Sequence, residues 1–143
     1  MRQLTDEAIA EVLAANGIGV LAFGETGRYP YAIPVAFGYD ADADVFALQL
    51  EGGTDSEKHR ALERHPYVSV TVFEETEPRE TWRSVVVRGK LVETSYEAVE
   101  TAFATLAKRT RSAPNPVVWG DSGSVTPYEL QIEEWSGRSF PIS

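Results

Sequence analysis

Short segments in which apolar and polar residues alternate are the feature that most restricts how this chain can fold. The segment 67–74 shows this most clearly, because Val68, Val70 and Val72 alternate with more polar neighbours, as in a strand with one buried face. Five more segments have strand character, namely 18–24, 29–39, 44–50, 82–92 and 125–135. Turns are expected at 25–28, 40–43 and 136–138. Six strands in hairpin order predict a mainly β fold, a small six-stranded antiparallel barrel with peripheral helices.

Three short helices are expected between these strands, over 5–16, 55–65 and 94–109. Thr5 is a good N-cap for the first, and Pro66 ends the second. The run from Thr94 to Glu97 has the form of a capping box and is expected to open the third. Gly89, inside the longest strand, predicts a bend or bulge.

The size and charge of the chain limit its class. Its 143 residues predict a single domain, 1–143. Its 22 acidic and 13 basic residues give a net charge of −9, which is a poor match for nucleic acid. There is no apolar run of about 20 residues and no secretory signal at the start. We therefore expect a soluble, cytoplasmic protein with neither a nucleic-acid nor a membrane partner.

Two absences in the composition narrow the chemistry further. The chain has no cysteine, which excludes disulfides, thiolate metal sites and cysteine nucleophiles. Its two histidines, His59 and His65, are six positions apart on one predicted helix and so point about 240° apart. We therefore expect no histidine-based metal site.

The predicted strand 29–39 has two unlike faces. Large side chains alternate with small ones, so Ala32, Pro34, Ala36 and Gly38 share one face. A flat ligand could lie against these small residues, and the alternative is that a helix or another strand packs there. Pro34 removes a backbone donor, which indicates a strand edge or an interruption of the sheet.

Two further segments carry cations. A glycine turn at 52–53 leads into the second helix, where backbone N–H groups and Lys58 would suit a phosphate; the alternative is an ordinary helix cap, with Asp55 and Glu57 repelling an anion. In the strand 82–92, Arg83 and Arg88 fall on opposite faces, so only one can point at a given ligand. Alternatively, both are exposed edge charges.

In this order, these segments resemble the FMN-binding split-barrel proteins related to pyridoxamine 5′-phosphate oxidase, in particular the short members that include the nitroimidazole-resistance-like flavoproteins. The resemblance runs from about Thr5 to Arg138 and is carried by the segments 31–37, 56–66, 82–89 and 134–138. It implies a split barrel, FMN as cofactor, and a homodimer with the flavin between two barrels.

The resemblance also implies which residues bind the cofactor. The strand from Ile33 to Phe37 would lie beside the flavin ring, and Ser56 and Lys58 would hold the phosphate, although the family usually has Arg where Glu57 stands. In the long loop 111–124 a large aromatic residue is typical of a ligand cover, with packing on the barrel end as the alternative. The full set of expected cofactor-binding residues is Ile33, Pro34, Val35, Ala36, Phe37, Gln49, Leu50, Ser56, Lys58, Arg83, Ser84, Trp119 and Trp135.

The implied function is that of an FMN-binding oxidoreductase acting on a small molecule. The C-terminal Arg-x-His substrate motif of the oxidase has no counterpart here, so we do not expect oxidation of pyridoxamine phosphate. No catalytic acid or base is evident; His59 is the nearest candidate, and the alternative for it is a helix-surface residue. Two other functions remain open: a non-catalytic flavin-binding or sensing module, and a split barrel that uses a deazaflavin or haem.

Overall fold

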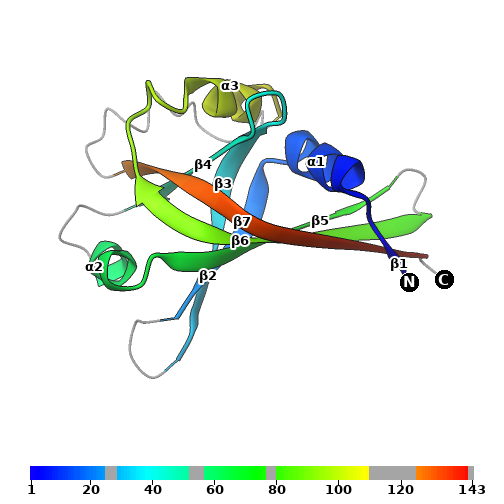
Figure 1. The fold of residues 1–143 in the computed structure, drawn as a ribbon, viewed down its shortest axis with the longest axis horizontal. Coiled ribbons are helices and arrows are strands. Elements are labelled where there is room, and N and C mark those ends of the chain that lie inside the picture. The colour runs from blue at the N-terminus through cyan, green and yellow to red at the C-terminus, as the bar shows by residue number, and fades with distance from the viewer. Residues whose placement is uncertain (25–28, 52–56, 77–79, 110–124, 142–143) are drawn as a thin grey trace.

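The computed structural model describes residues 1–24, 29–51, 57–76, 80–109 and 125–141 (Figure 1). Its elements in chain order are β1 (Arg2–Gln3), α1 (Asp6–Ala15), β2 (Ile18–Phe23), β3 (Tyr31–Asp40), β4 (Val45–Glu51), α2 (Glu57–Arg64), β5 (Tyr67–Glu75), β6 (Thr81–Glu93), α3 (Glu100–Arg109) and β7 (Val125–Pro141). All six expected strands are present, and the short β1 is an addition that the sequence pattern did not predict.

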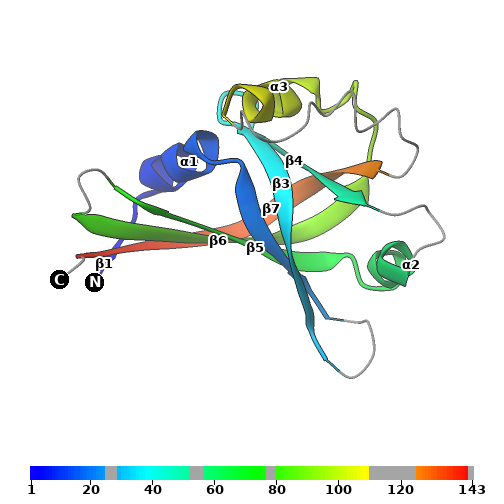
Figure 2. The ribbon, with the colours of Figure 1, turned by 180° about the vertical axis from the view of Figure 1, so that it is seen from behind.

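The strands form one antiparallel sheet in the order β1-β7-β4-β3-β2-β5-β6. A further pairing between β6 and β7 joins the ends of this order, so β2 to β7 close into a six-stranded barrel and β1 is added at the side of β7. The mainly β barrel with peripheral helices is therefore confirmed. The long strands β5, β6 and β7 continue beyond the barrel as an arm that passes under α1 (Figures 1 and 2).

Helix α1 covers one end of the barrel core. Thr5 caps it as expected, since its Oγ1 accepts a hydrogen bond from the backbone N–H of Ala8 at 3.1 Å. The apolar stripe of the helix, Ile9, Val12 and Leu13, is buried, as its spacing predicts.

Helix α3 covers β3 and β4 with a smaller apolar layer of its own, in which Val99, Ala102 and Phe103 surround the buried Ala47. The predicted start of this helix at residue 94 is wrong. Residues 96–99 form a turn, capped by a hydrogen bond from the N–H of Ala98 to Ser95 Oγ, and regular helix begins only at Glu100.

The predicted turn at 136–138 is also wrong, because β7 runs straight through it to Pro141 and Gly137 pairs with Val85. Gly137 is needed for a close approach instead. A Cβ there would lie 2.9 Å from Leu4 Cδ1 and 3.0 Å from Ile9 Cγ1, so the glycine lets the start of α1 pack directly on β7.

The bulge expected at Gly89 is confirmed. The pairing of β6 with β7 shifts register between Arg88 and Gly89. A Cβ on Gly89 would meet the carbonyl oxygen of Gln131 at 2.1 Å, so only glycine fits this point of the ladder. None of the helices in the described parts of the chain is long and apolar enough to cross a membrane.

Candidate functional site

The barrel is split between β3 and β4. Strand β3 pairs with β2 from Tyr31 to Ala36, but its pairing with β4 covers only Phe37 to Asp40. Strand β4 pairs with β7 from Phe46 to Glu51, so beyond Leu48 it stays beside β7, where Gln49 faces Pro127. The two strands therefore diverge at the pair Phe37–Leu48. Among the described residues, the N-terminal half of β3, residues 31–36, has β2 as its sheet neighbour on one side and no strand on the β4 side. Pro34, which has no N–H to offer a neighbouring strand, lies in this half, as the sequence suggests.

A pocket of about 280 Å³ opens at this divergence, and we refer to it as the split pocket. Three elements contribute to it: β3, the end of β4 and the start of α2. Its lining residues are Ile33, Pro34, Val35, Ala36, Gln49, Leu50, Glu51 and Lys58. All of these except Glu51 are among the cofactor-binding residues expected from the sequence. The structure thus brings Ile33 on β3 and Lys58 on α2 into the lining of one pocket.

The two faces of β3 are arranged as predicted. Val35 and Phe37 are buried in the barrel, whereas Ala32 and Pro34 are exposed. Phe37 does not line the split pocket; it stacks on Phe46, with the ring centroids 4.9 Å apart and the planes within 5°. Its proposed contact with a flavin stays a prediction.

Lys58 supplies positive charge to the split pocket. It is the second residue of α2, where backbone N–H groups and the helix dipole favour an anion. No described residue forms an ion pair with it. The exposed carboxylate of Glu51 lines the same pocket and lowers its affinity for anions. The sequence analysis missed Glu51, although its place directly after Leu50 could have indicated it.

Gln49 is a buried amide in the wall of the split pocket, with only 5% of its surface exposed. Its Nε2 donates a hydrogen bond to the hydroxyl oxygen of Tyr96 at 3.5 Å. Its Oε1 is buried and accepts a hydrogen bond from no described residue. Burial raises the pKa of Tyr96, so its hydroxyl stays protonated at neutral pH. Gln49 is one of the cofactor-binding residues that the family resemblance implies, but the sequence analysis did not connect it with Tyr96.

His59 follows Lys58 in α2 but faces the interior. It is 2% exposed, and its ring centroid lies 5.6 Å from that of Tyr128. Burial lowers the pKa of His59, which favours the neutral ring. His59 is therefore not a helix-surface residue, and it does not line the split pocket. It packs α2 against β7 through its contact with Tyr128.

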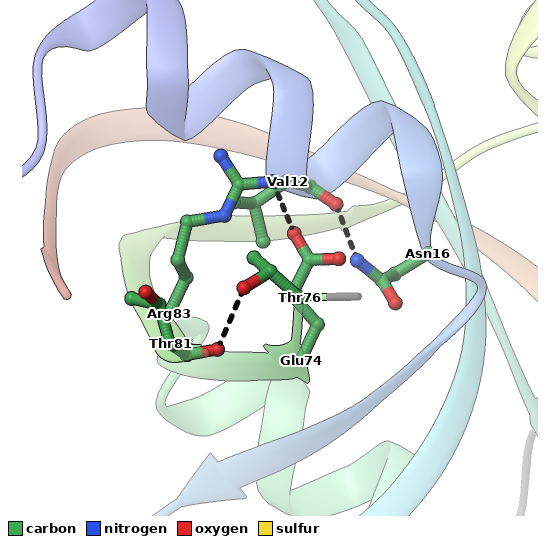
Figure 3. A network of polar contacts seen from close by, with 6 residues as sticks. All are labelled: Val12, Asn16, Glu74, Thr76, Thr81 and Arg83. Atoms are coloured by element: carbon green, nitrogen blue, oxygen red, sulfur yellow. Dashed lines mark hydrogen bonds and ion pairs between the residues drawn. The ribbon is translucent and has the colours of Figure 1, made fainter. Parts of the chain in front are cut away.

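Arg83 lies at the opposite end of the barrel, under α1 (Figure 3). Its Nη2 is 2.7 Å from Glu74 Oε1 on the neighbouring strand, and both side chains are about four-fifths buried. The pair lies beside Asn16, whose Nδ2 donates to the carbonyl of Val12 at 2.7 Å. Arg83 and its neighbour Ser84 do not line the split pocket of the same chain. As expected, Arg88 is on the other face of β6, where it pairs with Glu134 at 3.2 Å.

Trp135 also lies away from the split pocket. Its Nε1 donates to Asp6 Oδ1 at 2.9 Å, and its ring meets that of Tyr39 edge-on at 6.3 Å. It lines a small hollow of about 90 Å³ beside Arg88. Ser56 and Trp119, the remaining expected residues, lie outside the described parts of the chain.

A wider and more open hollow of about 670 Å³ lies on the outer face of the sheet, between the β2–β3 hairpin and β5. Its lining includes Tyr67, Ser69, Arg88 and Glu134. The sequence analysis did not anticipate it, because the angle at which the hairpin leaves the sheet is a property of the whole barrel. Within the described ranges, no group of three or more acidic or histidine side chains is arranged to hold a metal ion.

Comparison with known proteins agrees with this architecture. Residues 5–139 match the family model described as pyridoxamine 5′-phosphate oxidase. A crystal structure of a FAD-binding protein from Mesorhizobium loti is 30% identical and has a TM-score of 0.72, with 97% of each chain covered. The chain therefore belongs to the pyridoxamine 5′-phosphate oxidase family of split barrels.

More distant structures share the fold. One is a protein from Bacteroides thetaiotaomicron that is named for resistance to 5-nitroimidazole antibiotics. It is 19% identical over 97% of this chain and 87% of its own, with a TM-score of 0.67. A FAD and heme binding protein from Mycobacterium smegmatis is 18% identical over 100% of this chain and 77% of its own, with a TM-score of 0.68. No curated protein sequence matches the chain.

Proposed function

We propose that this protein binds a flavin in the split pocket, with FMN as the natural ligand. The observation that carries the proposal is the composition of the pocket: the small residues Pro34 and Ala36, a buried amide at Gln49 and an ammonium group at Lys58. A flavin offers the matching parts, namely a flat ring, polar ring and ribityl groups, and an anionic phosphate. The M. loti relative, named as FAD-binding, supports flavin as the class of ligand.

The residues of the pocket would divide the work of binding. The small face of β3 lets a flat ring approach the backbone, and the backbone N–H groups that open α2 act with Lys58 on the phosphate. A bound flavin would supply hydride or electron transfer. The protein would orient the ring and exclude water from it. On this basis we propose an oxidoreductase that acts on a small molecule.

A second copy of the chain is part of the proposal. At about 280 Å³ the split pocket is just below the range of about 300–1,000 Å³ that is usual for ligand pockets, so one protomer would leave much of the flavin uncovered. The outer face of the sheet is suited to a partner. It displays the exposed apolar side chains of Ile18, Tyr67, Phe73 and Phe140 around an uncharged row in which Val20, Thr71, Val86 and Ser136 are successive strand partners.

The homodimer is tested by light scattering at micromolar concentration. Wild type should give twice the 15.8 kDa of one chain, and Val86→Glu, which puts a charge into the centre of the face, should give a single chain and weaken flavin binding. A wild-type mass of one chain would refute the dimer.

The visible spectrum and the mass of the molecule that co-purifies with the protein test the choice of cofactor. A flavin spectrum and the mass of FMN are expected. The mass of FAD would change the identity of the flavin but not its class, whereas a deazaflavin mass or a haem Soret band would overturn the proposal. Bleaching of the bound flavin by NADH or NADPH, followed by turnover with an acceptor, would separate an oxidoreductase from a non-catalytic flavin-binding module.

A further inference from the structure

Gln49 occupies a place in the barrel where an apolar side chain would be expected. Its neighbours on the same face of β4 belong to the layer under α3, where Ala47 is fully buried among Val99 and Phe103. Burying an amide there is costly unless its polar atoms are hydrogen-bonded. Only one end of the amide has a partner, because Oε1 accepts nothing from the described residues.

Tyr96 contacts the nitrogen end of the amide, and the oxygen end is left without a partner among the described residues. Its hydroxyl oxygen accepts the hydrogen bond from Gln49 Nε2, and its ring is packed against that of Phe103 with centroids 5.4 Å apart. The amide is thus held from the α3 side by its nitrogen, and its carbonyl oxygen remains as an acceptor at a residue that lines the split pocket.

We propose that Gln49 is a specificity-determining residue whose Oε1 accepts a hydrogen bond from an N–H or O–H group of the flavin, and that Tyr96 is the residue that positions this amide. The inference rests on the flavin-binding function proposed above. A flavin has two kinds of donor that could serve, the imide N3–H of the ring and the hydroxyl groups of the ribityl chain. The acceptor would then reject a flat ligand that lacks the donor, since the buried oxygen would stay unpaired.

The experiment compares three ligands in wild type, Gln49→Met and Tyr96→Phe by fluorescence titration. Riboflavin carries both donors, 3-methylriboflavin lacks the ring N–H, and lumiflavin lacks the ribityl hydroxyls. Methionine keeps the length of glutamine and removes the acceptor. Wild type should bind riboflavin more tightly than one of the two analogues, and this hydrogen bond should account for about 2- to 12-fold of the ratio of the two affinities. Gln49→Met should lose that part of the ratio. The analogue concerned identifies the donor.

Tyr96→Phe should reduce the same preference while leaving the protein folded, because the ring still packs on Phe103. Gln131→Met, at an exposed position on β7, is the matched control and should bind all three ligands as wild type does. The melting temperature of ligand-free Gln49→Met should not fall, since the substitution removes an unpaired buried acceptor.

The outcomes separate this inference from the proposed function. If wild type binds riboflavin and Gln49→Met shows the same preferences among the three ligands, the role of Gln49 is refuted and flavin binding stands. If only Tyr96→Phe keeps the wild-type preferences, the positioning role of Tyr96 is refuted. If wild type binds neither riboflavin nor FMN, the flavin-binding proposal itself is refuted.

Discussion

Replacing Lys58 by alanine should weaken the binding of FMN much more than that of riboflavin. In the described part of the split pocket, Lys58 is the cationic side chain, and no described residue competes for it through an ion pair. A flavin phosphate carries close to two negative charges, and the chain as a whole carries −9. Loss of the ammonium group would therefore leave the phosphate with little beyond the N–H groups at the start of α2.

The expected size follows from the type of interaction. A hydrogen bond to a charged group contributes about 1.5–3 kcal/mol, which corresponds to a loss of affinity of about 10- to 150-fold. The half-buried position of Lys58 and the nearby carboxylate of Glu51 place the expectation near the lower end of that range. Riboflavin has no phosphate, so its affinity should change by less than about twofold.

Fluorescence titration of FMN and riboflavin into the ligand-free protein measures both values. Lys90→Ala is the matched control, because Lys90 is exposed on β6 and the substitution changes the net charge equally. The reasoning would be refuted if Lys58→Ala weakened FMN and riboflavin equally, or if Lys90→Ala had the same effect on FMN as Lys58→Ala.

Three further predictions concern other described residues. Glu51→Gln should tighten FMN by about 1.5- to 5-fold and leave riboflavin unchanged in the same titration, because it removes a like charge from the pocket rim. In urea unfolding, Arg83→Met should cost about 1–3 kcal/mol, because it leaves the largely buried Glu74 without its partner. Adding Glu74→Leu should restore part of this, and a larger loss in the double variant would contradict the ion-pair argument. Burial lowers the pKa of His59 from 6.5 in the folded protein, so the unfolded chain binds the proton more tightly. The contribution of the neutral His59 to the free energy of unfolding is therefore complete above about pH 6.5 and is lost as the pH falls towards the folded-state pKa. Urea midpoints between pH 5.5 and 7.5 should show this loss in wild type and in His65→Gln, and a smaller loss in His59→Gln; equal losses would refute it.

The strands could be predicted from sequence because their signal is local. Alternating burial in β5, with Val68, Val70 and Val72 inward, follows directly from the period of two. The open half of β3 was indicated by Pro34 for the same reason, since a missing N–H is a property of one residue. The glycine at position 137 shows the limit of such signals. Gly suits a turn and a close approach equally well, and only the contact with Leu4 and Ile9 distinguishes them.

The site was predictable where its residues come from one strand or one helix start, and not where it depends on the closure of the barrel. Residues 33–36 and Lys58 were each identified from their own segment, but the divergence of β3 from β4 that brings them together is set by the pairing of β4 with β7. Tyr96 could not be connected to Gln49, because 47 residues separate them. The burial of His59 likewise depends on Tyr128, which comes from the last strand.

The most direct test of the central claim, that the flavin binds where β3 and β4 diverge, is a substitution that fills the split pocket. Ala36→Trp places a large ring on the half-buried lining residue of the split pocket, and Ala104→Trp adds the same ring at an exposed position of α3. With circular dichroism confirming that both variants fold, FMN should bind Ala104→Trp with wild-type affinity and should bind Ala36→Trp at least about 100-fold more weakly. Wild-type affinity for FMN in folded Ala36→Trp would contradict the account, and the larger hollow on the outer face of the sheet would then be the place to look for the ligand.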